Sequence, residues 1–302
     1  MKKNPILLFV FSLFLVFPTL VKAQKTAAEF FEEGVTKSKA GDFMAALQAF
    51  NQAISMSPEN APSYYNRAMA KANLKDNRGA ILDFDRSIEL NPKYSDAYLY
   101  RGISKAKQDD FRSAIQDFSR SIELNPDDSQ GYYQRGINRS RLENYRGALQ
   151  DLNRTVELEP NNAGALYARG NVKLKLEDFT SALTDFSRVI DLTPKSPSAF
   201  AGRGYARIKL NDFNGSVADY SKAIELKPDE AESFYNRGFS RSKLEKYEEA
   251  IADFDQAITL DPQNHRAYYG RGFCKSKLGN QRDAISDLNK AVDLNNTPTD
   301  SK

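Results

Sequence analysis

Few side chains in this 302-residue sequence are of the kinds that enzymes use for nucleophilic or metal chemistry. His265 is the only histidine and Cys274 the only cysteine. One of each leaves no cluster for a metal ion and little scope for a Ser-His or Cys-His nucleophile. Carboxylate pairs such as Asp109-Asp110 and Glu248-Glu249 could exchange protons, but they fall at loops or helix starts, where capping and solvation explain them. We therefore expect no enzymatic activity, no cofactor and no metal.

The residues that do recur are structural, and they recur every 34 positions. Prolines, alanines and glycines each form a column, that is, a set of residues at one offset in consecutive units. The proline column consists of Pro58, Pro92, Pro126, Pro160, Pro194, Pro228 and Pro262. Counting back from the prolines predicts eight units, which are residues 27–60, 61–94, 95–128, 129–162, 163–196, 197–230, 231–264 and 265–298. We treat residues 24–302 as one domain.

Each unit reads as two helices separated by a short break. In the third unit the apolar residues of the second half, from Phe111 to Leu124, recur mostly at three- and four-residue steps and so mark one buried helix face. An aspartate such as Asp110 stands before that helix, where its carboxylate would accept hydrogen bonds from the first free amides. A proline follows it, so Asn125 marks its end. Because a two-helix unit cannot bury its apolar side alone, the units must stack into an all-α α-solenoid.

These columns resemble the tetratricopeptide repeat, whose pattern includes glycine, alanine, phenylalanine and proline at the offsets seen here. In the seventh unit they are Gly238, Ala250, Phe254 and Pro262. The resemblance implies a right-handed superhelix of helix-turn-helix units, with the first helix of each unit on the concave face. It also implies a non-enzymatic scaffold or adaptor that binds a protein partner.

Charged residues replace two apolar columns of that family. Seven units have arginine directly before the glycine, and all eight have lysine or arginine at the position where the family usually has tyrosine. The second helices of seven units carry aspartate at a matching offset. In the fifth unit these three residues are Arg169, Lys173 and Asp185. We expect a ladder of partly buried ion pairs between helices that fixes the register of the repeats. The alternative is that some arginines face a ligand.

By the same resemblance, positions 5 and 9 of each unit look into the groove, and here they form a tyrosine-rich floor with a basic margin at position 13. Such a surface favours a protein or peptide with apolar anchors and acidic groups. Alternatively, these rings pack against the next helix, or the tyrosines stack on sugars in a carbohydrate-binding accessory protein. The predicted groove residues are Tyr65, Tyr133, Tyr167, Asn171, Tyr205, Tyr235, Phe239, Tyr269 and Phe273, with Lys107, Arg141, Lys175, Lys209 and Lys243 on the margin.

The first 23 residues have the features of a secretory signal peptide. Two lysines precede an apolar run from Ile6 to Phe17, and Val21-Lys22-Ala23 suits cleavage before Gln24. We expect an exported bacterial protein, periplasmic or secreted, with no stable membrane anchor after cleavage. Three of the 43 lysines and arginines lie in this segment, so 40 remain against 40 acids. A neutral balance argues against nucleic-acid binding, which needs concentrated positive charge.

The last unit lacks the proline of the others, since Asn296 takes its place. Its second helix carries Ile285, Leu288 and Val292 on one face. Solenoids usually end in a polar cap, so we expect this face to meet a partner or a second copy of the chain.

Overall fold

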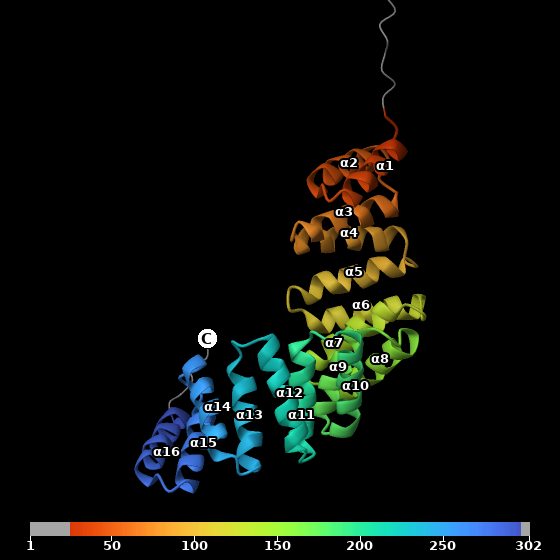
Figure 1. The fold of residues 1–302 in the computed structure, drawn as a ribbon. Coiled ribbons are helices and arrows are strands. Elements are labelled where there is room, and N and C mark those ends of the chain that lie inside the picture. Colours follow the sequence, from red (N-terminus) through yellow and green to blue (C-terminus); the bar gives the residue numbers. More distant parts are fainter. Residues whose placement is uncertain (1–24, 297–302) are drawn as a thin grey trace, which may run out of the picture.

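The computed structural model describes residues 25–296, and all of its regular secondary structure there is helical (Figure 1). The predicted signal peptide lies outside the described residues. The chain forms an all-α solenoid of antiparallel helix pairs. The first helices of the pairs are α1 (Ala27–Lys39), α3 (Ala61–Asn73), α5 (Ser95–Ala106), α7 (Ser129–Arg141), α9 (Ala163–Lys175), α11 (Pro197–Lys209), α13 (Ala231–Lys243) and α15 (His265–Lys277). The second helices are α2 (Phe43–Met56), α4 (Asn77–Leu90), α6 (Phe111–Leu124), α8 (Tyr145–Leu158), α10 (Phe179–Leu192), α12 (Phe213–Leu226), α14 (Tyr247–Leu260) and α16 (Gln281–Asn296).

The helix ends follow the residues that predicted them. Asp110 is the N-cap of α6, and its carboxylate accepts a hydrogen bond from the Ser113 amide at 3.2 Å. Asp42, Asp178 and Asp212 cap α2, α10 and α12 in the same way. At the other end of α6, Asn125 is the C-cap and has left the helical conformation ahead of Pro126. In the units that have both residues, an aspartate and a proline thus set the bounds of the second helix locally.

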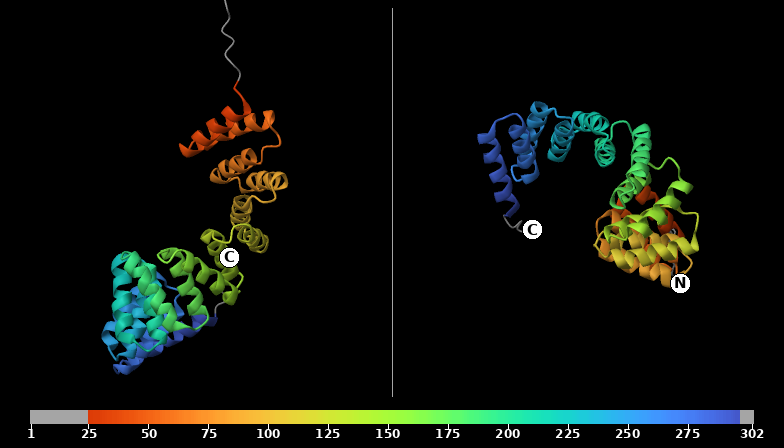
Figure 2. Two further views of the ribbon diagram at one scale, coloured as in Figure 1. Left: turned by 90° about the vertical axis from the view of Figure 1, so that its right-hand side faces the viewer. Right: turned by 90° about the horizontal axis from the view of Figure 1, so that it is seen from below.

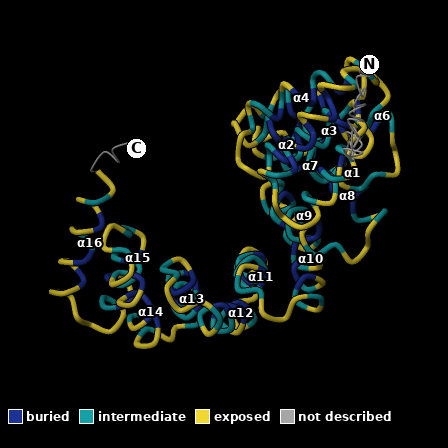
Figure 3. Tube along the Cα trace, turned by 90° about the horizontal axis from the view of Figure 1, so that it is seen from above, coloured by how far each residue is buried: buried dark blue, intermediate teal, exposed yellow. Residues whose placement is uncertain are grey.

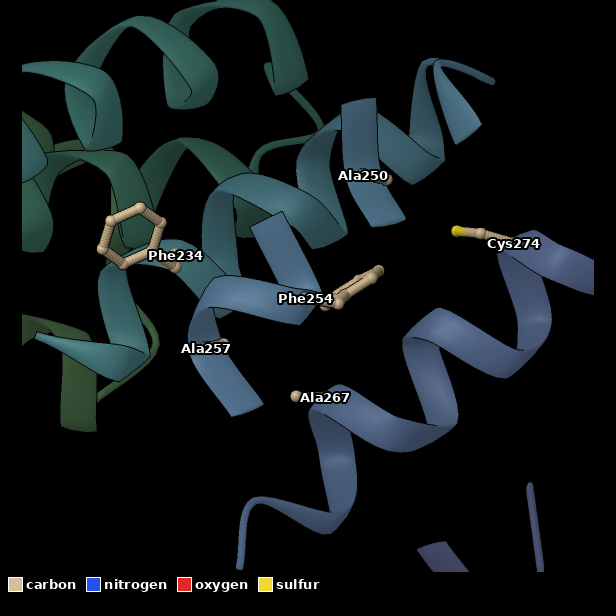
Figure 4. Packing of buried hydrophobic residues seen from close by; sticks show 6 residues of the cluster. All are labelled: Phe234, Ala250, Phe254, Ala257, Ala267 and Cys274. Carbon is tan, nitrogen blue, oxygen red and sulfur yellow. The ribbon is translucent and has the colours of Figure 1, made fainter. Parts of the chain in front are cut away.

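The core of each pair forms where an aromatic side chain meets a residue with little or no side chain. A Cβ atom added at Gly102 would lie 2.7 Å from the Phe118 ring, so only glycine lets these helices approach so closely. The next pair covers the other side of such a ring. Phe254 projects from α14 toward α15, where Ala267 and Cys274 face it (Figure 4). Each core is therefore shared between neighbouring pairs, as stacking requires.

The stack curves because the odd-numbered helices lie closer to one another than the even-numbered ones do. Each odd helix contacts the next odd helix, whereas consecutive even helices make no such contact within residues 25–296. The chain therefore follows an arc (Figure 2). Figure 3 shows α11, α13 and α15 on the inner side of this arc and α12 and α14 on its outer side, with the buried residues between them. The odd helices line the inner face.

Candidate binding surface on the inner face

All of the predicted groove residues belong to odd helices or their C-caps, so the structure brings them to one face of the arc. Their exposure divides them into three groups. The first group is half-buried and consists of six aromatic residues and one asparagine, namely Tyr65, Tyr133, Tyr167, Asn171, Tyr205, Tyr235 and Phe239. Tyr269 and Phe273 are more open, with 61% and 40% of their surface exposed. The margin is exposed throughout, at Lys107, Arg141, Lys175, Lys209 and Lys243.

The half-buried rings serve partly as core. Tyr65 packs against Phe84 of its own pair, with ring centroids 5.9 Å apart, and against Tyr94 at 4.8 Å. Tyr167 and Tyr235 pack in the same way on Phe186 and Phe254. Burial raises the pKa of Tyr65, so its hydroxyl stays protonated. The rings of Tyr65, Tyr167 and Tyr235 therefore pack against neighbouring rings and stay partly exposed.

Part of the basic margin rests on the rings of the same helix, one turn away. The Lys209 ammonium lies 5.4 Å from the centroid of Tyr205, and Lys243 lies 5.4 Å from that of Phe239. The quadrupole of an aromatic ring attracts a cation above its face, and at exposed sites this attraction is worth about 0.5–1 kcal/mol. On α11 and α13, an aromatic ring is thus followed one turn later by a positive charge.

An apolar cavity of this face lies between α13 and α15. It is a cavity of about 410 Å³ walled by Tyr235, Phe239, Tyr269 and Phe273, and we call it the C-terminal cavity. Gly270 opens its floor, because a Cβ atom there would lie 2.5 Å from the Phe254 ring beneath. Three cations line it (Lys243, Arg266 and Lys277), against one acid, Glu245. An apolar side chain flanked by carboxylates is the complement of such a site.

Sequence reasoning missed Arg266, which stands at position 2 of the eighth unit. Its guanidinium lies 4.2 Å from the centroid of Tyr235 and 3.4 Å from a Glu232 carboxylate oxygen. It also lines a second cavity of about 280 Å³ that adjoins the first and reaches Val292 of α16. The residue type at position 2 varies widely among the units, so no recurring residue predicted a role for this position.

The predicted ladder of ion pairs lies between the two helices of the second to the eighth pair. Asp185 accepts hydrogen bonds from Nε and Nη2 of Arg169 at 2.9 and 2.7 Å, and Lys173 Nζ lies 2.7 Å from the same carboxylate. The remaining nitrogen of Arg169, Nη1, donates to Asn153 of the preceding pair at 3.1 Å. The same arrangement recurs at Asp83, Asp117, Asp151, Asp219, Asp253 and Asp287. Register is thus fixed within a pair and between pairs.

The residues that could have carried other chemistry are placed for packing. Cys274 is fully buried, and burial raises the pKa of its thiol, which disfavours the reactive thiolate. In residues 25–296 no three histidine, cysteine or acidic side chains are arranged to hold a metal ion. No helix in that range has the length and hydropathy to span a membrane. The predicted self-association face lies on α16, where Ile285 and Val292 are each 57% exposed, and its partner stays a prediction.

Comparison with protein families identifies the repeat. Tetratricopeptide repeat models match residues 31–95, 65–129, 133–197, 231–264 and 265–298, and a further TPR repeat model matches residues 204–244. The chain belongs to the tetratricopeptide repeat family. No curated protein sequence matches it.

Solved structures share this fold at low sequence identity. MamA from Desulfovibrio magneticus RS-1 is 22% identical and aligns over 57% of this chain and 97% of its own, with a TM-score of 0.54. YrrB, described as a TPR protein with an unusual peptide-binding site, is 24% identical over 60% of this chain and 93% of its own, with a TM-score of 0.53. A chain of the APC/C hetero-tetramer Cut9-Hcn1 is 16% identical over 80% of this chain and 48% of its own, with a TM-score of 0.57.

Proposed function

We propose that the chain is a non-enzymatic scaffold that binds a segment of a partner protein along its inner face, with the main anchor in the C-terminal cavity. The observation that carries this proposal is the coincidence of exposed rings and cations at one place. Tyr269 and Phe273 are the most exposed of the predicted groove rings, and Lys243, Arg266 and Lys277 surround them. Aromatic anchors in a pocket with a charged rim are typical of protein-binding hot spots.

The preferred segment carries an apolar or aromatic side chain with acidic neighbours. Its apolar group would enter between Tyr235 and Tyr269, and its carboxylates would meet the cations at the rim. YrrB is described as binding peptides on the same fold, which supports the class of ligand but not its identity.

Selection of random peptides displayed on phage against the mature protein tests this proposal. We expect the enriched peptides to share an aromatic or aliphatic residue beside aspartate or glutamate. Their affinity should fall by about tenfold or more in Tyr269→Ala and in Lys243→Glu. Arg120→Ala on the exposed side of α6 is the matched control and should bind as the parent does. Enriched peptides that lose affinity in the control but not in the groove variants would contradict the proposal.

The carbohydrate alternative is tested on the same variants. Tyrosine rings also stack on sugar faces, and Tyr269 presents 61% of its surface. The glycan-binding proposal would replace the protein-binding one under two conditions. The protein must bind cell-surface glycans saturably and bind no peptide, and Tyr133→Ala or Tyr269→Ala must abolish the glycan binding.

We also propose that this binding takes place outside the cytoplasm, in the bacterial envelope or beyond it. The support is the apolar N-terminal run with its cleavage pattern before Gln24. Fractionation of the expressing cells, with N-terminal sequencing, should recover a protein that begins at Gln24 outside the inner membrane. Recovery in the cytoplasm with Met1 in place would overturn this part alone.

A further inference from the structure

The sixth helix pair lacks a contact between rings that several other pairs contain. In four pairs a ring at position 5 packs on a ring at position 24, as Tyr167 does on Phe186 with centroids 5.7 Å apart. The other three pairings are Phe31–Phe50, Tyr65–Phe84 and Tyr235–Phe254, each at 5.9 Å. The sixth unit has Ala201 at position 5 and Tyr220 at position 24. The space that a ring would fill is therefore left open.

The result is a cavity of about 270 Å³ on the inner face between α9, α11 and α13, which we call the repeat-6 cavity. Ala201 and Tyr220 line it, together with the rings of Tyr167 and Tyr205. Glu230, the last residue of the sixth unit, and Glu232, near the start of the seventh, also line it. It is separate from the C-terminal cavity, with which it shares no lining residue.

Tyr220 lines this cavity although only 2% of its surface is exposed. Its phenolic hydroxyl is the polar group that this side chain can offer to a ligand there. Burial raises the pKa of Tyr220, so the group stays a neutral phenol that can donate and accept. The other units have phenylalanine or leucine at this position, so packing alone does not require a hydroxyl.

The charge of the cavity favours a cation. Two carboxylates line it and no basic side chain does. Glu230 accepts a hydrogen bond from the Ser233 hydroxyl at 3.3 Å, and Glu232 accepts one from the Asn236 amide at 3.2 Å. Lys227 and Arg266 each lie 3.4 Å from one of these acids, but outside the cavity. The faces of two tyrosine rings add negative potential at its walls.

We infer that the repeat-6 cavity receives an arginine side chain of the bound protein segment. The apolar stem lies between the rings of Tyr167 and Tyr205, and the guanidinium donates hydrogen bonds to the Tyr220 hydroxyl and to the carboxylates. Arginine suits the site better than lysine because its planar head stacks on aromatic rings and donates in several directions. The inference rests on the proposed function. It adds a second subsite whose charge is opposite to that of the C-terminal cavity. The two opposite charges together fix the direction in which the segment lies.

Nuclear magnetic resonance titration of the mature protein with N-acetylarginine amide tests the inference, with N-acetylglutamate amide and glucose as the comparison ligands. We expect the arginine compound to shift the amide signals of Gly202, Tyr220 and Ser233 saturably, and the other two to leave them in place. Glu232→Gln should weaken the response by about fivefold. Equal shifts from the glutamate compound or from glucose would overturn the inference.

The chain itself supplies a matched variant that closes the cavity. Ala201→Tyr combined with Tyr220→Phe gives the sixth pair the rings of the second, fifth and seventh pairs. We expect it to keep the helical circular dichroism of the parent and to lose the arginine response, and an undiminished response would overturn the inference. If arginine fails to bind while an acidic aromatic peptide still shifts Gly270 and Phe273, only this inference falls. If neither binds, the proposed function falls with it.

Discussion

At the scale of single residues, the unusual feature is a buried aspartate that two cations share. Asp185 is 3% exposed and contacts both Arg169 and Lys173, so its charge is fully paired inside the pair of helices. Removal of one member of such a group leaves the others desolvated and unpaired, which costs far more than the intact group contributes. The ladder is therefore better understood as a device that excludes other registers than as a large source of stability.

Asp185→Asn tests this interpretation. The amide keeps the shape of the side chain but leaves Arg169 and Lys173 without a counter-charge, so the free energy of unfolding should fall by about 3 kcal/mol. Urea denaturation followed by circular dichroism measures the change. Asp191→Asn, at an exposed position on the same helix, is the control and should have little effect. An unchanged midpoint for Asp185→Asn would show that the ladder does not fix the register.

The ladder also predicts a pH dependence at its last member. Burial alone would raise the pKa of Asp287, but the hydrogen bonds from Arg271 and Lys275 outweigh it and hold the pKa below its usual value. A carboxyl with a lowered pKa stabilises the fold above its unfolded pKa of about 3.9, and that contribution disappears as the pH falls further. The stability lost in Asp287→Asn should thus be greatest near neutrality and shrink below about pH 4. A loss that stays constant down to acid pH would exclude this origin.

At the scale of the helix pair, the turn inside each unit carries a backbone strain. The second residue before the second helix has a positive φ in all eight units, but only Gly41 and Gly279 are glycines. The other six, among them Glu177 with a φ of 61°, hold a side chain in the left-handed region. Side chains there cost about 1 kcal/mol relative to glycine.

Exchange of the turn residues should change stability in opposite directions. Gly41→Ala should lower the free energy of unfolding by about 1 kcal/mol, since nothing lies near the added methyl group and only the backbone is strained. Glu177→Gly should raise it by a similar or smaller amount, because glycine relieves the strain at the positive φ but also gains entropy in the unfolded chain, which offsets part of the gain. Thermal denaturation compares the two. The same sign of change in both variants would refute the backbone explanation.

The helix pairs could be predicted from sequence more completely than the binding surface. Asp110 and Asn125 act on their immediate neighbours, so their residue types and positions alone indicated a cap and a helix end. The repeat-6 cavity could not be predicted in this way, because it results from what Ala201 lacks and from which side chains surround the gap. The half-burial of Tyr65 likewise depends on Tyr100 of the next unit, whose ring centroid lies 6.1 Å away, and a column within the repeat does not reveal a contact between units.

At the scale of the whole molecule, curvature makes the odd helices into one continuous inner face. Along that face the repeat-6 cavity, lined by two acids, is followed by the C-terminal cavity, lined by three bases and one acid. A segment with an arginine toward the sixth pair and an acidic, apolar stretch toward the eighth would match both charges at once. The opposite direction would place like charges together, which disfavours it.

Crosslinking of a selected peptide to the protein tests the central claim most directly. A benzophenone group is placed on the peptide, and the crosslinked residues are identified by mass spectrometry. We expect them on α11, α13 and α15, with none on α12 or α14. Crosslinks mainly on α12 and α14, at the outer side of the arc, would contradict the claim that the inner face is the binding surface.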